Sequence, residues 1–416
     1  MFSFIHTADI HLDSPLRGLN QHADAPIDQI RRATRRALEN LVSLALDKCV
    51  DFIVIAGDLY DGDWPDYSTG LFFNKQMSRL KEAQITVYLI SGNHDAASKI
   101  TKNLKPPSNV KALSTKKPET IFVDGLPVAI HGQGFATPRV PENLSLEYPA
   151  ATPEFFNIGM LHTSLTGNPE HDPYAPCSIN NLTEKGYDYW ALGHIHQHAI
   201  IQENPHIVYS GNPQGRHIKE TGERGCYLVD VDDQLTIKDV SFKITDVVRW
   251  EALEINITDL VDADAVRESI AQHIETTLAE TNGRLLALRI TLFGDSALHD
   301  QLHAELAQWQ AECVSLANEI EEDMIWFERL RIKTKPTYNP QELAERDDLT
   351  KLVLEALEHF TPSQVPTPVI QLSERLKSID SKDLRDILTL SEPEEQLKQD
   401  VSAIVLQSIS TSSISE

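Results

Sequence analysis

The stretch Phe2-Ser-Phe-Ile-His-Thr-Ala-Asp-Ile-His11 decides the fold, because it joins an apolar strand to a pair of metal-binding side chains. The apolar positions at its start predict a buried strand. Asp9 and His11 follow, two positions apart, and offer a carboxylate oxygen and an imidazole nitrogen to one ion. Alone the pair is weak evidence, because such pairs arise by chance and a strand-end turn would be the better explanation.

Four further strand-like runs end in side chains of the same kind. Residues 52–56 are followed by Asp58, residues 86–91 by Asn93, His94 and Asp95, residues 156–161 by His162, and residues 189–192 by His194 and His196. Open α/β sheets place their ligands at the carboxyl ends of strands. Buried polar groups there cost free energy unless they are paired. The five strand ends together therefore predict a metal site.

The types of these side chains indicate the chemistry. Hard oxygens mixed with imidazole nitrogens suit Mn²⁺, Fe²⁺ or Zn²⁺, and no thiolate is present to favour a softer ion. One carboxylate able to bridge, with ligands on both sides, predicts a two-metal centre for phosphoryl transfer. His94, beside Asn93, is predicted to protonate a leaving oxygen or to stabilise charge on phosphorus. Asp95 is predicted to orient the His94 imidazole.

The remaining pattern predicts three regions. Helices at 27–49 and 71–82 alternate with strands that are apolar on both faces, which indicates an α/β domain over residues 1–244. Residues 245–335 alternate strand and helix (strands 250–257, 285–292 and 325–332, helices 264–280 and 299–319) without a ligand cluster, and predict a small second domain. Residues 336–416 begin with Pro336 and Pro340 and show helical spacing at 349–360 and 381–390.

The formal net charge of -25 lies mostly outside the ligand-bearing region. Residues 1–110 carry 12 Lys and Arg against 13 Asp and Glu, whereas residues 245–416 carry 15 against 33. The acidity therefore weakens the case for a nucleic-acid substrate without excluding it. The four cysteines are scattered, and neither a membrane-spanning run nor a signal peptide is evident. These features predict a cytoplasmic protein with reduced thiols.

In order, Asp9-x-His11, Gly57-Asp58, Gly92-Asn-His-Asp95, His162 and Gly193-His-x-His196 resemble the full signature of the calcineurin-like metallophosphoesterases. The resemblance covers residues 1–244. Within that family, residues 6–15 and 57–61 are similar to the SbcD-type DNA repair exonucleases. Residues 131–135, 174–178, 187–196 and 211–217 are closer still to the YhaO branch. Some relatives carry a second His three residues after the Gly-Asp pair, where this chain has Asp61.

This resemblance implies a four-layer α/β/β/α sandwich, followed by a small α+β cap that binds DNA and a helical C-terminal tail. It implies two divalent ions, with Mn²⁺ expected. Asp9, His11 and His196 would hold one ion, Asn93, His162 and His194 the other, with Asp58 bridging and His94 catalytic. The implied activity is a DNA exonuclease of double-strand-break repair and recombination. The implied partners are DNA, a coiled-coil ATPase subunit of the SbcC type docked on the C-terminal helices, and a second copy of the chain, with no membrane.

Two other readings compete with the nuclease. A metallophosphatase or phosphodiesterase could act on small molecules or phosphoproteins with the same site, but it would need neither a cap nor a partner-binding tail. A non-catalytic scaffold could keep the fold. Scaffolds of this type tend to lose ligands, and none of the seven ligand candidates or His94 is missing here, so the scaffold ranks last.

Overall fold

The computed structural model describes residues 1–14, 26–61, 67–97, 104–165 and 174–337 of the 416-residue chain. They form two compact units, and the boundary between them falls between Trp250 and Glu251. The helices predicted at 349–360 and 381–390 lie outside the described ranges. Within those ranges every helix is too short or too polar to cross a bilayer.

The first sheet of unit 1 has the strand order β12-β11-β1-β2-β3-β4. Its strands are β1 (Phe2–Thr7), β2 (Phe52–Ala56), β3 (Thr86–Ile90), β4 (Val110–Ala112), β11 (Gly225–Val231) and β12 (Ile237–Ile244). Strands β1 to β4 run parallel, and β11 and β12 continue the sheet antiparallel beyond β1. The carboxyl ends of β1, β2 and β3 therefore share one edge.

The second sheet of unit 1 has the order β5-β6-β7-β8-β10-β9. Its strands are β5 (Glu119–Phe122), β6 (Val128–Gly132), β7 (Phe156–His162), β8 (Tyr189–Gly193), β9 (Ala199–Glu203) and β10 (His206–Tyr209). The four central strands are parallel, and β5 and β9 close the two edges antiparallel.

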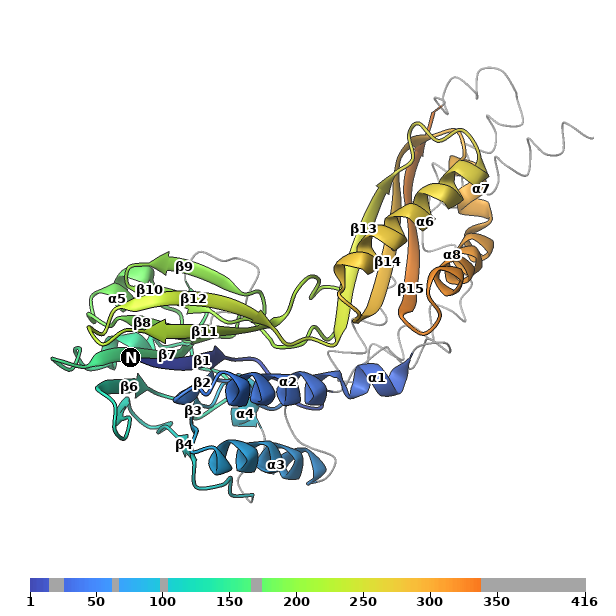
Figure 1. The fold of residues 1–416 in the computed structure, drawn as a ribbon. Helices are drawn as coiled ribbons and strands as arrows, with labels where there is room; N and C mark the ends of the chain where they lie inside the picture. Colours follow the sequence, from blue (N-terminus) through green and yellow to red (C-terminus); the bar gives the residue numbers. More distant parts are fainter. Residues whose placement is uncertain (15–25, 62–66, 98–103, 166–173, 338–416) are drawn as a thin grey trace, which may run out of the picture. The chain divides into compact units, whose positions relative to one another are not determined.

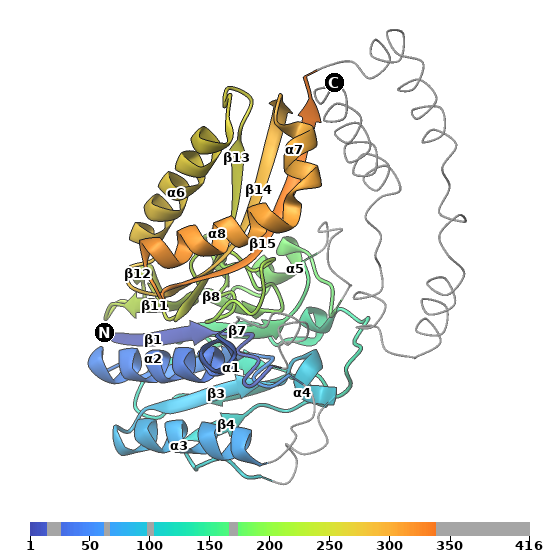
Figure 2. The ribbon, with the colours of Figure 1, turned by 90° about the vertical axis from the view of Figure 1, so that its right-hand side faces the viewer.

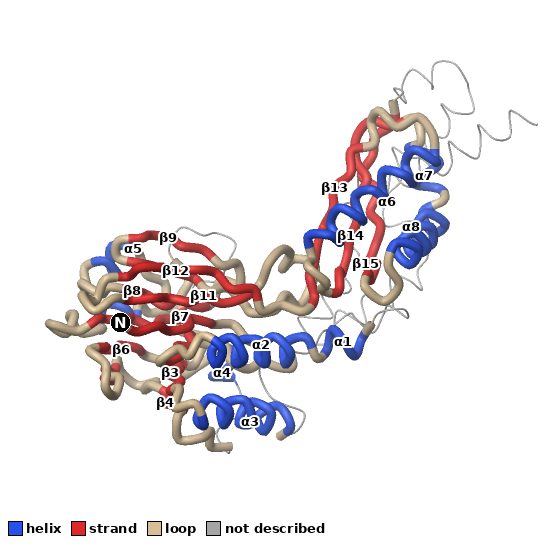
Figure 3. Tube along the Cα trace, in the orientation of Figure 1, coloured by secondary structure: helices blue, strands red, loops and turns tan. Residues whose placement is uncertain are grey.

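The two sheets pack face to face, and helices cover their outer faces (Figures 1 and 3). The helices of unit 1 are α1 (Ile27–Arg31), α2 (Ala33–Asp47), α3 (Ser68–Glu82), α4 (Asn93–Ala97), the 3-10 helix η3 (Leu144–Glu147) and α5 (Ile179–Thr183). A core that includes Phe4, Phe52 and Phe156 fills the space between the sheets. A second core packs the first sheet against α2 and α3, which lie side by side. The predicted α/β/β/α sandwich is confirmed, with only short helices in the fourth layer.

Unit 2 is a three-stranded sheet with the order β13-β14-β15. Its elements are β13 (Val248–Asn256), α6 (Ala263–Glu280), β14 (Leu285–Ser296), α7 (His299–Ala304), α8 (Leu306–Ile320) and β15 (Ile325–Pro336). Strands β14 and β15 run parallel. The three helices cover one face of the sheet (Figure 2), and apolar side chains such as Trp309 and Ile290 fill the layer between them.

Local details differ from the predictions at several positions. The helix predicted over 27–49 is divided at Arg32, and the helix predicted over 299–319 is divided at Glu305. Strands β4 and β9 were not predicted. Strand β9 lacks a buried face, since Ile200 and Ile201 are both exposed, and pairing with β10 holds it in the sheet. An exposed edge strand has no alternation of apolar and polar residues to reveal it.

Candidate metal centre

The five strand ends named by the sequence meet at one edge of unit 1. Strands β1, β2 and β3 of the first sheet and β7 and β8 of the second all end there. The turns that follow are tightly wound, since Asp9, His11 and Asp58 have φ values of 51°, 45° and 50°. Backbone hydrogen bonds join the first two turns, with the Asp9 N–H donating to the Gly57 carbonyl at 3.0 Å and the His11 N–H to the Asp58 carbonyl at 3.1 Å. Residues in this sparsely populated backbone region cluster at functional sites.

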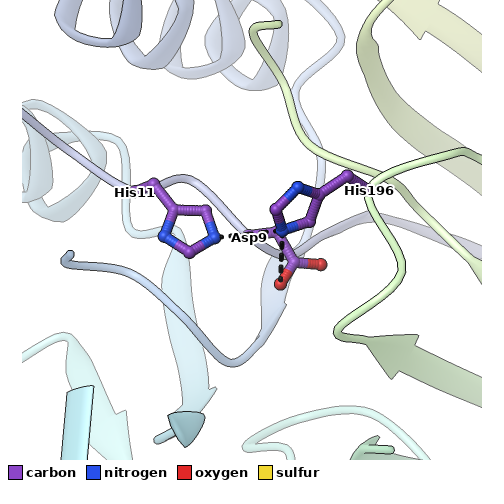
Figure 4. A group of neighbouring side chains, drawn as sticks. All are labelled: Asp9, His11 and His196. Carbon is purple, nitrogen blue, oxygen red and sulfur yellow. Dashed lines mark hydrogen bonds and ion pairs between the residues drawn. The ribbon is translucent and has the colours of Figure 1, made fainter. Parts of the chain in front are cut away.

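Asp9, His11 and His196 form one group of potential ligands (Figure 4). The Nε2 atoms of His11 and His196 face each other at 3.1 Å, and His196 Nε2 lies 3.9 Å from Asp9 Oδ1. Burial and the nearby Arg216 guanidinium lower the pKa of His11 well below its ordinary value. A metal requires neutral imidazole, so this environment favours the form of His11 that can bind an ion.

Asp58, His162 and Asn93 form a second group of potential ligands. His162 Nε2 lies 3.4 Å from Asp58 Oδ2 and 3.0 Å from Asn93 Oδ1. The other ring nitrogen, Nδ1, lies 3.0 Å from the Ala56 carbonyl, which it bonds as a donor and which fixes the ring. Burial alone would lower the pKa of His162, but the Asp58 carboxylate raises it to about 9. Burial likewise opposes ionisation of Asp58, while His162 brings the Asp58 pKa down to about 2.

Asp58 stands between the two groups. Its Oδ2 atom is 3.4 Å from His162 Nε2 and 3.9 Å from His11 Nε2, and its Oδ1 accepts the His94 backbone N–H at 2.9 Å. His194 joins the cluster through its ring, whose centroid lies 5.3 Å from that of His162, and its backbone N–H donates to the Asp9 carboxylate. The structure therefore brings together all seven residues predicted as metal ligands.

Two glycines allow the sheets to come this close. A Cβ atom on Gly193 would lie 2.1 Å from the Ala56 carbonyl oxygen, and one on Gly57 would lie 2.4 Å from His162 Nδ1. Gly57 also has φ +99°, a conformation that L side chains rarely adopt. Any other residue at these positions would displace the strand ends that carry the ligands.

His94 pairs with Asp61, so the predicted role of Asp95 is wrong. His94 Nδ1 lies 2.6 Å from Asp61 Oδ1, and Asp61 also accepts a hydrogen bond from the Ser14 hydroxyl at 2.5 Å. Burial works to lower the pKa of His94, but the Asp61 carboxylate raises it. The Asp95 carboxylate instead accepts the backbone N–H groups of Leu59, Tyr60 and Gly92, and so holds the turns after β2 and β3 together.

A further buried carboxylate, missed by the sequence reasoning, supports His196. Glu220 Oε1 lies 2.7 Å from His196 Nδ1 and accepts from Arg216 Nη2 at 3.1 Å. Burial works to raise the pKa of Glu220, but His196 and Arg216 hold it far below its ordinary value. Arg216 also lies 3.5 Å from Asp61, so one guanidinium links the carboxylates behind His196 and His94. Carboxylates in this position fix the orientation of metal-binding imidazoles.

The donor set fits two divalent cations. Two carboxylates, one amide oxygen and four imidazoles converge without a thiolate, which is the ligand chemistry of Mn²⁺, Fe²⁺ or Zn²⁺. The two Nε2 atoms that face each other at 3.1 Å are spaced as two ligands of one ion. His94 is 42% exposed and therefore accessible to a substrate.

Comparison with known proteins agrees with this geometry. The family model for calcineurin-like phosphoesterases matches residues 2–198, and the model for the middle domain of the metallophosphoesterase YhaO matches residues 250–335. The metallophosphoesterase YhaO of Bacillus subtilis (strain 168) is 34% identical over 383 residues, which is 86% of this chain and 90% of that protein.

Two solved structures align with part of the chain. The protein TT1561 of Thermus thermophilus aligns with a TM-score of 0.34 and 13% identity, over 59% of this chain and 99% of its own. A dimetal phosphatase from Danio rerio aligns with a TM-score of 0.33 and 12% identity, over 59% of this chain and 96% of its own.

Proposed function

The chain belongs to the calcineurin-like metallophosphoesterases, and from this premise we propose that it is a two-metal DNA nuclease. The activity would be hydrolysis of phosphodiester bonds by an exonuclease of double-strand-break repair and recombination. The coarser part of this statement, a metal-binding hydrolase of phosphate esters, follows from the family. The DNA substrate is our proposal.

The observation that carries the chemistry is the place of Asp58 between two ligand groups. We assign Asp9, His11 and His196 to one ion, Asn93, His162 and His194 to the other, and Asp58 to both. When bound, the two ions would supply Lewis acidity at the phosphoryl group and stabilise charge on its oxygens. We propose Mn²⁺ because the mixture of hard oxygens and imidazoles suits it.

The proton transfer would fall to His94. Its Nδ1 atom is held by Asp61, so the proton on Nε2 can point away from that carboxylate. A raised pKa keeps His94 protonated toward higher pH, which is the state a general acid needs. His94 would thus donate a proton to the leaving oxygen, and Asp61 would hold the ring in place.

A DNA substrate is supported by the second unit and by the resemblance of residues 6–15 and 57–61 to SbcD-type nucleases. A phosphatase of small esters needs no cap, whereas a nuclease needs surface beyond the metal site to hold a polymer. Two divalent ions would add four positive charges to the metal site. We further propose that residues 336–416 dock a coiled-coil ATPase subunit and that two copies of the chain associate.

The net charge of -25 favours a small phosphate ester as the competing substrate. The test is to offer end-labelled duplex and single-stranded DNA alongside bis-p-nitrophenyl phosphate, each with Mn²⁺. We expect cleavage of both substrate classes. Hydrolysis of the small ester alone, with or without an ATPase partner, would reject the nuclease.

Variants divide the roles within the site. Asp58→Asn should weaken both ions and abolish cleavage, whereas Asp239→Asn, an exposed carboxylate on β12, should not. His94→Ala should keep its ions and lose turnover, with His273→Ala on the exposed face of α6 as its control. Metal analysis showing an empty centre in the His94 variant would contradict the assignment of His94 as a residue that binds no ion.

A further inference from the structure

Strand β15 carries a row of cations on the sheet face that the helices of unit 2 leave open. Leu330, Ile332 and Thr334 are buried on the helix side. The residues that alternate with them are all exposed and all basic: Arg329, Arg331, Lys333 and Lys335. Successive side chains of a strand point to opposite faces, so these four share one face. Figure 2 shows the three helices on the opposite face of the sheet.

The row stands out against an acidic background. Residues 251–337 hold 7 Lys and Arg against 17 Asp and Glu, and four of the seven lie on this one face of β15. Arg267 on α6 is paired with Glu312, and Arg289, the register partner of Arg329 on β14, is paired with Glu328. Within the described ranges no carboxylate forms an ion pair with Arg329, Lys333 or Lys335. The exposed carboxylate Asp295 of β14 is the register partner of Lys335 and shares this face. With four cations against this one exposed carboxylate, the row is still a local concentration of positive charge in a unit whose net charge is negative.

The spacing of the row suits an extended polyanion. Alternate residues of a strand are about 6.6–6.8 Å apart, so the four cations span about 20 Å in a nearly straight line. A strand of duplex DNA rises about 3.4 Å per nucleotide and turns to the far side of the helix within half a turn, about 17 Å. An extended single strand can stay beside the row over its whole length, whereas a duplex strand cannot.

An aromatic ring lies next to the row. Phe293 of β14 is the register partner of Lys333, so both side chains project from the same face. Phe293 is 36% exposed, so its ring is accessible from the open face of the sheet. Grooves that bind single strands combine basic residues along the backbone with aromatic rings on which bases stack.

We propose that this face of β15 binds the phosphodiester backbone of a single DNA strand, with Phe293 stacking on a base. The proposal rests on the proposed nuclease function and names the form of DNA and the residues that hold it. The cations neutralise phosphates without reading sequence, so the site binds single strands with no base preference.

The test measures DNA affinity against salt concentration for the full-length protein in EDTA, where no hydrolysis occurs. The probe is a fluorescently labelled single strand, with the duplex of the same sequence in parallel. The variant Arg329→Gln/Lys333→Gln/Lys335→Gln is compared with Lys75→Gln/Lys116→Gln/Lys117→Gln, which removes three exposed charges from unit 1. Each lost phosphate contact lowers the slope of log affinity against log salt by about 0.7 for a single strand. We expect the β15 variant to lose about 2 from that slope and the control to keep it.

Phe293→Ala should weaken single-strand binding about 5- to 150-fold with little change in the salt slope, because stacking is not ionic. Hydrolysis of bis-p-nitrophenyl phosphate with Mn²⁺ should be unchanged in all three variants, and this control checks that they fold.

The proposal would be overturned if the β15 variant kept the salt slope and the DNA affinity of the wild-type protein. The nuclease would still stand in that case, because the wild-type protein binds DNA. The row would then serve only to keep an edge strand from pairing with another sheet. Loss confined to the duplex would also overturn it. Wild-type protein that binds no DNA in EDTA would overturn the row, and the cleavage assay with Mn²⁺ would then decide the nuclease separately.

Discussion

Replacing Glu220 with Gln should weaken one metal site and spare the other. Glu220 Oε1 bonds His196 Nδ1 at 2.7 Å, and Oε2 accepts from Asn212 Nδ2 at 2.9 Å and from the backbone N–H of Arg216 at 2.7 Å. The glutamine amide keeps the size of the side chain but removes its charge. It has one oxygen in place of two, and that oxygen cannot accept both from His196 on one side and from Asn212 and Arg216 on the other. Loss of the partner behind a metal-binding imidazole costs about 10- to 100-fold in affinity, which is about 1.4–2.7 kcal/mol.

The measurement is Mn²⁺ titration by calorimetry, with the two sites resolved. Glu223→Gln is the matched control, because that carboxylate is 48% exposed and lies 3.9 Å from Arg249, away from the ligands. Unfolding of the metal-free variant in EDTA checks that it folds. We expect it to fold, since Arg216 keeps Asp61 as a partner. Unchanged affinity at both sites, or an equal loss at both, would refute the assignment of Glu220 to His196 and of His196 to one ion.

The other predictions concern the second ligand group and the proton donor. Asp61→Asn should lower kcat roughly 10- to 100-fold without loss of Mn²⁺, a part of what a positioned acid contributes. The alkaline limb of the pH–rate profile of this variant should move to lower pH, because Asp61 raises the pKa of His94. An unmoved limb would count against the pairing of His94 with Asp61. Gly57→Ala should displace His162, cost about 1–3 kcal/mol in denaturant unfolding and weaken Mn²⁺ binding, whereas Gly125→Ala, at φ +80° with open space around it, should leave binding intact. Equal effects at the two glycines would show that backbone strain alone is at work. Mn²⁺ affinity should rise by up to about tenfold per pH unit as the pH approaches 9, because below a pKa of about 9 a proton occupies the His162 nitrogen that an ion needs. A flat calorimetric profile from pH 6 to 9 would contradict that pKa.

Patterns confined to one stretch of chain were readable from the sequence. Strand β2 matches the predicted 52–56 residue for residue. It is apolar over its whole length, and only burial in a sheet explains such a run. The seven ligand candidates were readable because each follows a strand. They come from two sheets, β1 to β3 in one and β7 and β8 in the other, and in each sheet the parallel strands end at the same edge.

Contacts between distant loops were not readable. Asp95 adjoins His94 in sequence, but the two stand on helix α4, where neighbouring side chains do not face each other. The partner of His94 is Asp61, from a turn 33 positions earlier in the chain. Glu220 reaches His196 in the same way, from the loop before β11. Only the folded topology brings these carboxylates behind the imidazoles.

The central claim is that Asp58 is shared by two metal ions. Anomalous scattering at the manganese edge, from crystals of the full-length protein grown with Mn²⁺, tests it most directly. We predict two peaks about 3.5–4 Å apart, each within bonding distance of an Asp58 carboxylate oxygen. A single peak, or two peaks of which only one contacts Asp58, would contradict the account.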